Sequence, residues 1–204
     1  KYGSQQKMLT KLQLPDKKCC SVDLATGTGK SFLIYAIAQI AMHEGLVDQV
    51  LVLCPSVTIE NGLMDKFNQF AGSKDLRNAL PVGKNITPRI INANQTILAG
   101  DICVENIHAV YANTNASIKD SLIGKGSRTL ILNDEAHHIF NKVSGSDEGK
   151  IKEWKKFLIN TEFNFNYIVN FTGTPYIDND YFSDVIYRYS VNKAITDHIV
   201  KIPS

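Results

Sequence analysis

Continuous apolar runs alternate with segments of helical periodicity along most of this chain. The apolar runs lie at residues 19–24, 50–54, 129–132 and 167–171. Runs of this kind are typical of parallel strands that are covered on both faces. The segments between them have apolar residues at helical spacing, which predicts helices at 31–43, 59–70, 117–123 and 152–158. The pattern therefore predicts an α/β fold with a mainly parallel central sheet and helices on both faces.

The remaining segments have weaker patterns. Residues 1–14 are predicted to be helical, with an apolar stripe, and residues 191–200 are predicted to form a short closing helix. Turn-forming residues predict irregular structure at 71–88, a flexible turn at 124–127 and a mobile loop at 141–150. Candidate strands lie at 89–91, 101–105 and 181–189, and residues 106–111 fit either a short helix or a loop.

A glycine-rich loop joins the first apolar run to the first long helix, and it consists of Thr26, Gly27, Thr28, Gly29, Lys30 and Ser31. Without a Cβ, the two glycines let the backbone curl tightly and bring its N–H groups against phosphate oxygens. The helix that starts here adds the positive end of its dipole. The loop therefore predicts a phosphate-binding site in which Lys30 contacts the β- and γ-phosphates and Ser31 ligates magnesium.

Two adjacent carboxylates, Asp134 and Glu135, follow the apolar run at 129–132. The end of a central parallel strand lies on the same sheet edge as the glycine loop. We expect Asp134 to hold magnesium and Glu135 to orient and deprotonate an attacking water. The alternative is an acidic helix N-terminus that favours the helix dipole. A zinc site is disfavoured because His137 and His138 have no Cys or His partner at zinc spacing.

Polar residues follow two further strands. Pro55 and Ser56 end the run at 50–54, and Thr172-Gly173-Thr174-Pro175 ends the run at 167–171. Loops at the carboxyl ends of strands are where open α/β sheets bind ligands. Near the start of the chain, Gln5 and Gln6 offer amides that can pair with an adenine edge, although solvated surface glutamines fit the sequence equally well.

Composition limits how the chain can meet its partners. The 204 residues suit one domain with a sizeable core, and the net charge of +2 creates only a weak overall field. Nucleic-acid binding must then come from local basic groups, backbone amides and helix ends. The four cysteines form no C-x-x-C pair, which predicts reduced, buried thiols in a cytoplasmic protein. No apolar run predicts a membrane span, and the first residue, Lys1, predicts a fragment of a longer chain.

Taken together, these motifs resemble the first RecA-like domain of superfamily 2 helicases and translocases, which are P-loop NTPases. The chain is most similar to the motor of type I and type III restriction enzymes, the type III restriction enzyme Res-subunit family. The resemblance rests on residues 25–31 as motif I, 134–137 as a DEAH box and 171–175 as motif III, with Pro55-Ser56 at the place of motif Ia. Residues 189–203 are similar to the passage between the two motor domains of that family.

The resemblance implies an ATP- and Mg²⁺-dependent motor domain that acts on DNA rather than RNA. It assigns catalysis to Lys30 and Glu135, magnesium to Ser31 and Asp134, and nucleotide contacts to residues 26–31. It assigns adenine recognition to Gln5 and nucleic-acid contact to Pro55 and Ser56. The coupling of nucleotide state to the grip on DNA is assigned to His137, Thr172 and Thr174.

The resemblance also implies partners outside these residues. The family's second RecA-like domain, with its arginine finger, is not in this sequence, and other restriction-modification subunits are possible partners. An arginine finger contributes several orders of magnitude to the rate of related enzymes. We therefore expect the chain on its own to bind ATP and to hydrolyse it slowly.

Other functions fit parts of the same pattern. A metabolic phosphotransferase also uses a glycine loop and magnesium, but the arginines of this chain, at positions 77, 89, 128 and 188, are scattered rather than grouped in a lid. A non-catalytic interaction domain is disfavoured because Lys30, Asp134 and Glu135 are all present. A repair- or RNA-directed helicase of the same superfamily shares these motifs and remains open.

Overall fold

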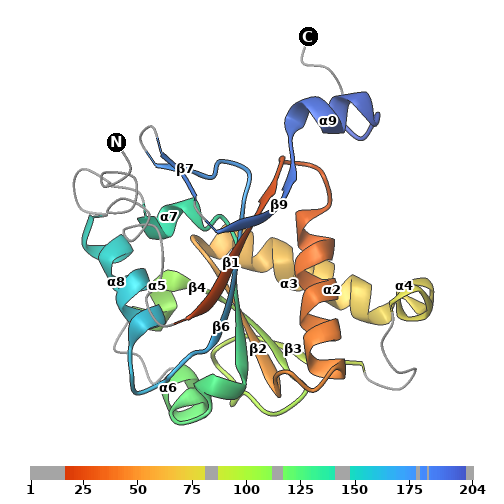
Figure 1. The fold of residues 1–204 in the computed structure, drawn as a ribbon. Coiled ribbons are helices and arrows are strands. Elements are labelled where there is room, and N and C mark those ends of the chain that lie inside the picture. Colours follow the sequence, from red (N-terminus) through yellow and green to blue (C-terminus); the bar gives the residue numbers. More distant parts are fainter. Residues whose placement is uncertain are drawn as a thin grey trace.

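The computed structural model of this chain describes residues 17–80, 87–111, 117–140, 148–177, 180–182 and 184–200. Strands and helices alternate through these ranges (Figure 1). The strands are β1 (Lys18–Leu24), β2 (Gln49–Cys54), β3 (Ile90–Ile91), β4 (Ile102–Asn106), β5 (Thr129–Asn133), β6 (Tyr167–Thr172), β7 (Tyr176–Ile177), β8 (Asp180–Tyr181) and β9 (Val185–Tyr189). The helices are α2 (Lys30–His43), α3 (Val57–Gly72), α4 (Lys74–Ala79), α5 (Ile107–Tyr111), α6 (Ser117–Leu122), α7 (His137–Phe140), α8 (Glu148–Ile159) and α9 (Val191–Thr196), with a 3-10 turn at η1 (Gly126–Arg128).

The main sheet has seven strands in the order β3-β4-β2-β5-β6-β1-β9. Every neighbouring pair in it is parallel, which confirms the predicted parallel sheet. β7 and β8 form a separate antiparallel pair. Parallel strands end at a common edge, so the loops that follow β1, β5 and β6, three adjacent strands, meet there.

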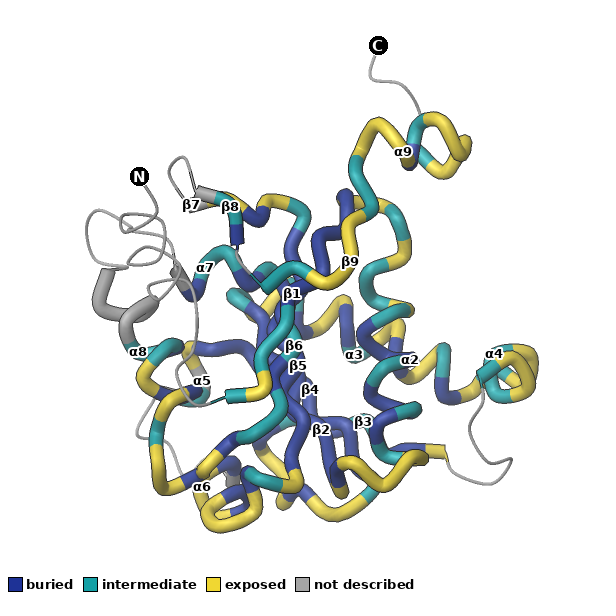
Figure 2. Tube along the Cα trace, in the orientation of Figure 1, coloured by how far each residue is buried: buried dark blue, intermediate teal, exposed yellow. Residues whose placement is uncertain are grey.

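Helices cover both faces of the sheet, and each face has its own apolar core. On one face α2 and α3 pack through Tyr35 and Phe67, whose ring centroids lie 5.6 Å apart. On the other face Trp154 of α8 is buried, and its indole nitrogen donates to Oδ1 of Asn133 at 3.2 Å. The central strands are buried along their length, whereas α4 and α9 are largely exposed (Figure 2). Trp154 is therefore a core residue.

Two helices differ from the predicted boundaries. α4 lies within the stretch 71–88 that the sequence predicts to be irregular. It can begin directly after α3 because the Ser73 hydroxyl accepts a hydrogen bond from the Leu76 N–H at 3.3 Å. α8 starts at Glu148, inside the segment predicted to be a loop. Both differences come from local capping and tertiary packing, which hydrophobic periodicity does not report.

The end of the chain also differs from its predicted elements. The candidate strand at 181–189 is divided between β8 and β9, which belong to different sheets. The predicted closing helix ends at Thr196, because Asp197 caps it and His198 takes a positive φ of 57°. The predicted helix at 1–14 lies outside the described residues.

The cysteines lie in or beside the sheet as free thiols. Cys54 and Cys103 are buried and Cys19 and Cys20 are half-buried. Burial raises the pKa of each of these thiols, so they carry little thiolate at neutral pH. The predicted burial is confirmed for Cys54 and Cys103, whereas Cys19 and Cys20 are less buried than predicted.

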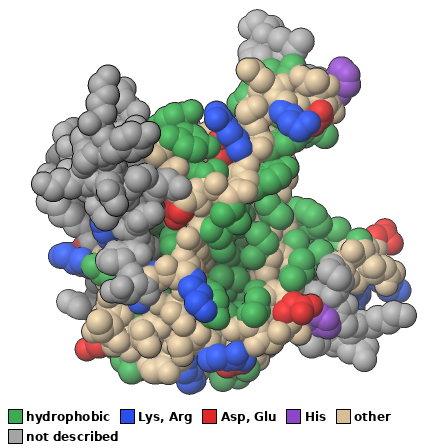
Figure 3. Space-filling view, in the orientation of Figure 1, with side chains coloured by type: hydrophobic (Ala, Val, Ile, Leu, Met, Phe, Trp, Pro, Cys, Tyr) green, Lys and Arg blue, Asp and Glu red, His purple; other side chains and the backbone are tan. Residues whose placement is uncertain are grey.

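The surface shows no large basic field on the face that Figure 3 presents. Lys and Arg side chains are scattered singly there, and hydrophobic side chains gather in the middle of the face, between β1 and α2 (Figure 3). Partly buried apolar residues pack against the core that contains Tyr35 and Phe67, and they include Leu33, Ile37, Tyr167, Val169 and Tyr189. Among the helices in the described ranges, none has both the length and the apolar composition needed to cross a membrane.

Candidate nucleotide-binding site

The glycine loop lies between the end of β1 and the start of α2. Gly27 and Gly29 have φ angles of 83° and 90°, in the left-handed region where a side chain is disfavoured. The Thr28 hydroxyl donates to the carbonyl of Ala25 at 2.6 Å and closes the turn. Gly29 is the N-cap of α2, and Thr26, Gly27 and Gly29 are exposed. The loop therefore has the tight curl that the sequence predicts at the N-terminus of a long helix.

Lys30 contacts both carboxylates of the acidic pair. Its ammonium lies 3.1 Å from Oδ1 of Asp134 and also donates to Oε1 of Glu135. These contacts join the start of α2 to the turn after β5, two segments that are far apart in the sequence. The single cation offsets only part of the charge of the two anions, in a place where Asp134 is only 4% exposed. The structure thus brings together Lys30, Asp134 and Glu135, as expected from the shared edge.

Burial decides the protonation behaviour of Asp134. Loss of solvent raises the pKa of its carboxyl group, and the nearby Lys30 ammonium works in the opposite direction. The neighbouring Glu135 carboxylate also raises the pKa of Asp134. A carboxylate in this environment gains from a second cation, because extra positive charge would offset both burial and repulsion.

The turn that carries the acidic pair has a strained backbone. Glu135 has a φ of 51°, which costs a residue with a Cβ on the order of 1–3 kcal/mol. Backbone hydrogen bonds to both neighbouring strands hold the turn: Asp134 N–H donates to Leu53 at 2.8 Å, and Ala136 N–H donates to Phe171 at 2.9 Å. The Glu135 side chain in this turn contacts Lys30.

His137 connects the acidic turn to the loop after β6. Its Nδ1 lies 2.9 Å from Oγ1 of Thr172, and the same hydroxyl accepts the Thr174 N–H at 3.1 Å. Nδ1 also lies 3.5 Å from Oε2 of Glu135. Burial, followed by the neighbouring His138, lowers the pKa of His137, so the ring is mostly neutral at pH 7. Three of the predicted coupling residues therefore form one hydrogen-bonded group.

Gly173, in the loop that follows β6, packs against the backbone at the end of β1. A Cβ added to it would lie 2.9 Å from the carbonyl oxygen of Leu24. Real Cβ atoms essentially never approach a carbonyl oxygen this closely. The glycine in the sequence Thr-Gly-Thr thus permits contact between the loops that follow β6 and β1.

Other predicted site residues are placed separately. The Ser31 hydroxyl accepts a hydrogen bond from Lys66 of α3 at 3.5 Å and makes no contact with Asp134 that would place it in the acidic group. The Ser56 hydroxyl caps α3 by accepting from the Ile59 N–H at 3.4 Å, next to a half-buried Pro55. Gln5 lies outside the described residues.

The sequence analysis missed a second polar group beside the loop. Asp23, near the end of β1, is 5% exposed, and its Oδ2 lies 3.1 Å from Nε of Arg188 on β9. The Tyr181 hydroxyl donates to the same oxygen at 2.9 Å. The available signal was a single carboxylate inside an otherwise apolar strand, but its partners lie far away in the sequence.

Comparison with known families gives one match over most of the chain. A family described as "Type III restriction enzyme, res subunit" matches residues 3–177. No curated protein sequence matches the chain.

Solved structures show where the fold recurs. A nuclease-deletion mutant of the Type ISP restriction-modification enzyme LlaGI, in complex with a DNA substrate mimic, aligns with a TM-score of 0.58 and 14% identity. The alignment covers 98% of this chain and 20% of LlaGI, so it supports the fold alone.

Two further structures align less closely. The UvsW helicase of bacteriophage T4 aligns at a TM-score of 0.44 and 14% identity, over 84% of this chain and 51% of UvsW. The Sulfolobus solfataricus SWI2/SNF2 ATPase core, in complex with double-stranded DNA, aligns at 0.48 and 20% identity, over 85% and 31% of the two chains. The chain thus spans at most about half the length of these proteins.

Proposed function

Because the chain belongs to the type III restriction enzyme res-subunit family, we propose that it is an ATP-binding and ATP-hydrolysing motor domain of a DNA helicase or translocase. The observation that carries the proposal is the contact of Lys30 with both Asp134 and Glu135 at the carboxyl edge of a parallel sheet. A loop that can cradle phosphates and an acidic pair that can hold a cation and a water are the parts that phosphoryl transfer to water needs.

The residues at this edge have the chemistry for magnesium ATP. Carboxylate and hydroxyl oxygens, here Asp134 and Ser31, are the ligand types that magnesium prefers. Magnesium, when bound, supplies positive charge that neutralises the phosphates. For Ser31 to ligate magnesium, its hydroxyl must give up the hydrogen bond from Lys66 and turn to the cation.

In the proposed reaction Lys30 leaves the carboxylates and pairs with the β- and γ-phosphates of ATP. Glu135 is then free to accept a proton from the water that attacks the γ-phosphorus, while the bond to the β-phosphate oxygen breaks. The Glu135 carboxylate contacts Lys30, so it lies beside the place that Lys30 vacates. Transition-state charge is stabilised by the loop amides and by Lys30.

His137, Thr172 and Thr174 are proposed to couple the nucleotide to the grip on DNA. The neutral His137 ring lies within hydrogen-bonding distance of Thr172 and 3.5 Å from Glu135. A movement of Glu135 when ATP is hydrolysed can therefore pass through the His137 ring to the Thr172 hydroxyl, and so reach the loop after β6. The loop with Pro55 and Ser56 lies at the same sheet edge and is the proposed DNA contact.

The proposed partners are DNA and a second motor domain that supplies an arginine to the transition state. DNA is preferred to RNA as the substrate because the family that matches the chain is described by a restriction enzyme, a class that acts on DNA. Without the second domain, turnover by this chain is expected to be slow.

Replacement of Glu135 by Gln tests the reaction. We expect the Kd for ATP to stay within about threefold, because Gln keeps the shape, and single-turnover hydrolysis to fall by roughly 10²–10⁴-fold with the base removed. Glu162→Gln, at an exposed carboxylate away from the site, is the matched control. Repeating the assay with DNA and with RNA separates the two substrates. Equal hydrolysis by wild type and Glu135→Gln would contradict the proposed role of Glu135.

A further inference from the structure

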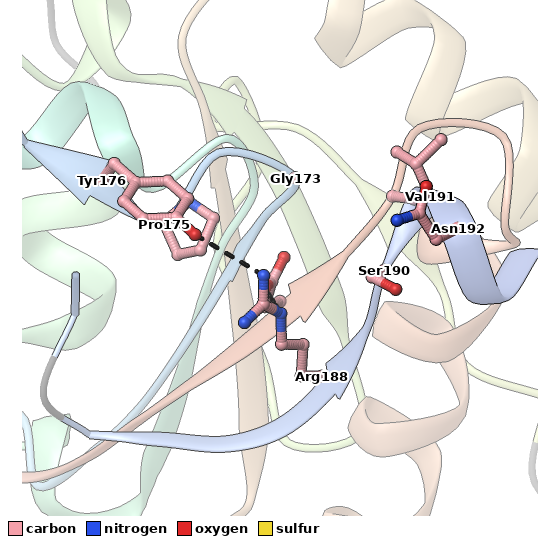
Figure 4. A pocket seen from close by; sticks show the side chains of 9 residues that line it. Gly173, Pro175, Tyr176, Arg188, Ser190, Val191 and Asn192 are labelled. Carbon is pink, nitrogen blue, oxygen red and sulfur yellow. Dashed lines mark hydrogen bonds and ion pairs between the residues drawn. The ribbon is translucent and has the colours of Figure 1, made fainter.

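A polar group that we call the Asp23 cluster lies beside the glycine loop, and it consists of Asp23, Tyr176, Tyr181 and Arg188. Asp23 accepts from the Tyr181 hydroxyl at 2.9 Å and pairs with Arg188 at 3.1 Å. The Arg188 guanidinium lies over the Tyr181 ring, 5.3 Å from its centroid. It also lies 3.5 Å from the Tyr176 hydroxyl (Figure 4). The cluster thus joins β1, the β7–β8 pair and β9.

The pairing inside the cluster is needed because Asp23 is buried. A buried carboxylate that loses its partner is left with uncompensated charge, which is strongly destabilising. Burial, with the hydrogen bond to Asp23, raises the pKa of Tyr181 to about 12, so its hydroxyl stays protonated and donates. Arg188 is the cation that the structure places against this carboxylate.

Three members of the cluster, Asp23, Tyr176 and Arg188, line a cavity of about 240 Å³ beside the end of β1. Ala25 and Gly173 form part of its wall, and Arg188 lies between Tyr176 on one side and Ser190 on the other (Figure 4). The Ala25 N–H donates to the carbonyl of Tyr189 at 3.0 Å, so the last residue of β9 is bonded directly to the start of the loop.

The chain beyond β9 then returns to the loop. After α9, a methyl group of Val200 lies 3.8 Å from the position that a Cβ on Gly27 would take. Residues 190–200 therefore leave the sheet beside the start of the glycine loop, and Val200 near their far end lies close to Gly27. Tyr189 and Val200 lie on either side of α9.

We propose that Asp23 and Arg188 are positioning residues that hold the glycine loop and residues 190–200 as one unit. Loss of the Arg188 ion pair would loosen β9, and with it the segment 190–200 that ends near Gly27. If the loop binds a nucleotide, as the proposed function holds, linkage makes the effect reciprocal: the nucleotide stabilises the segment, and the segment tightens nucleotide binding.

Hydrogen exchange of the nucleotide-free chain tests the unit itself. In Arg188→Gln we expect the amides of residues 25–29 and of residues 190–200 to exchange roughly tenfold faster, since both lose a common anchor. Arg128→Gln is the control for the loss of an arginine ion pair, because Arg128 pairs with the exposed Asp48, at 2.6 Å, away from the loop. Faster exchange in residues 190–200 alone, or unchanged exchange in both segments, would overturn the proposal.

Milder variants decide the question should Arg188→Gln not fold. Tyr181→Phe removes one hydrogen bond to Asp23 and keeps both charges, and Arg188→Lys keeps the charge but not the planar fork. Each is expected to raise exchange in both segments together, by about two- to fivefold. If exchange rose only in β8 and stayed at the wild-type rate in residues 25–29, the result would contradict the proposal that the two segments form one unit.

Nucleotide titration separates this proposal from the proposed function. We expect Arg188→Gln to weaken ATP binding by roughly three- to tenfold, which is the size of a typical coupling free energy between two linked sites. Arg128→Gln is expected to leave ATP binding unchanged. A wild-type chain that binds no ATP would contradict the proposed function, while the exchange result alone would still decide whether the unit exists. Wild-type ATP affinity in Arg188→Gln would overturn the reciprocal link.

Discussion

The side-chain nitrogen of Lys30 lies 3.1 Å from Oδ1 of Asp134 and is bonded at the same time to Glu135. The lysine of the glycine loop thus lies where phosphates and a cation are proposed to bind. Its charge offsets part of the negative charge of the acidic pair. Incoming phosphates must draw Lys30 away from these carboxylates, while the cation that accompanies them takes over its role.

We predict that Asp134→Asn makes the ligand-free chain more stable at neutral pH. The pKa of Asp134 is raised by burial above its unfolded value of about 3.9. Its contribution to stability is therefore present below that pH and is lost as the pH rises through the folded pKa. Asn has no charge to bury, so we expect Tm at pH 7 to rise by about 2–4 °C.

Scanning calorimetry measures this difference, with Asp65→Asn as a control because Asp65 is exposed on α3. The control should shift Tm by less than about 1 °C, as surface substitutions do. A lower Tm in Asp134→Asn would show that the Lys30–Asp134 ion pair outweighs the cost of burying the carboxylate.

Much of the fold could be predicted from the sequence, because each central strand is apolar on both faces. The run 50–54 became β2, and residues 129–132 and 167–171 became β5 and β6, each with its polar loop at the predicted edge. Hydrophobic pattern alone specifies such strands, since they must be covered on both sides. Motif spacing then placed Lys30 near Asp134 without any knowledge of side-chain positions.

The Asp23 cluster and the cap of α4 could not be predicted in the same way. Asp23 pairs with residues on β8 and β9, and their neighbours in space are set by the strand order rather than by any local pattern. The hydroxyl of Ser31 is a similar case, because its contact with Lys66 depends on how α3 packs beside α2. Contacts between distant segments of this kind need the tertiary structure.

Gly173→Ala is predicted to destabilise the chain. The added methyl group would lie 2.9 Å from the carbonyl oxygen of Leu24, so the loops after β1 and β6 must separate. We expect a loss of about 1–3 kcal/mol in the free energy of unfolding, as overpacking causes. Urea denaturation followed by circular dichroism measures it.

Gly62→Ala is the matched control for this prediction. Gly62 lies inside α3, and a Cβ there meets nothing within 4 Å. Alanine in an open helical position should raise the free energy of unfolding by about 0.5–1 kcal/mol. Equal effects of the two substitutions would show that the close approach of Gly173 to Leu24 does not limit the fold.

The stability of the chain is predicted to fall as the pH drops below about 6.5, the usual pKa of an unfolded histidine. Burial and the neighbouring His138 lower the pKa of His137 in the folded chain, so the unfolded state binds the proton first. Stability is therefore kept above pH 6.5 and lost as the pH falls through the folded pKa. His138 has a lowered pKa for the same main reason and adds to the effect.

Urea denaturation at a series of pH values tests this prediction. His137→Asn should have a shallower dependence between about pH 5 and 6.5, because one of the two titrating rings is gone. His198→Asn, at an exposed position, should keep the wild-type slope. A wild-type slope in His137→Asn would mean that His137 does not change its protonation on folding.

The most direct test of the nucleotide site is a calorimetric titration of magnesium ATP into the wild-type chain and into Lys30→Ala. Loss of the charge-assisted contacts from Lys30 to the phosphates is predicted to weaken binding by about 100-fold or more. Lys156→Ala, an exposed lysine on α8, should bind as wild type does. Equal affinity of wild type and Lys30→Ala, or no binding by either, would contradict the assignment of this loop as a nucleotide site.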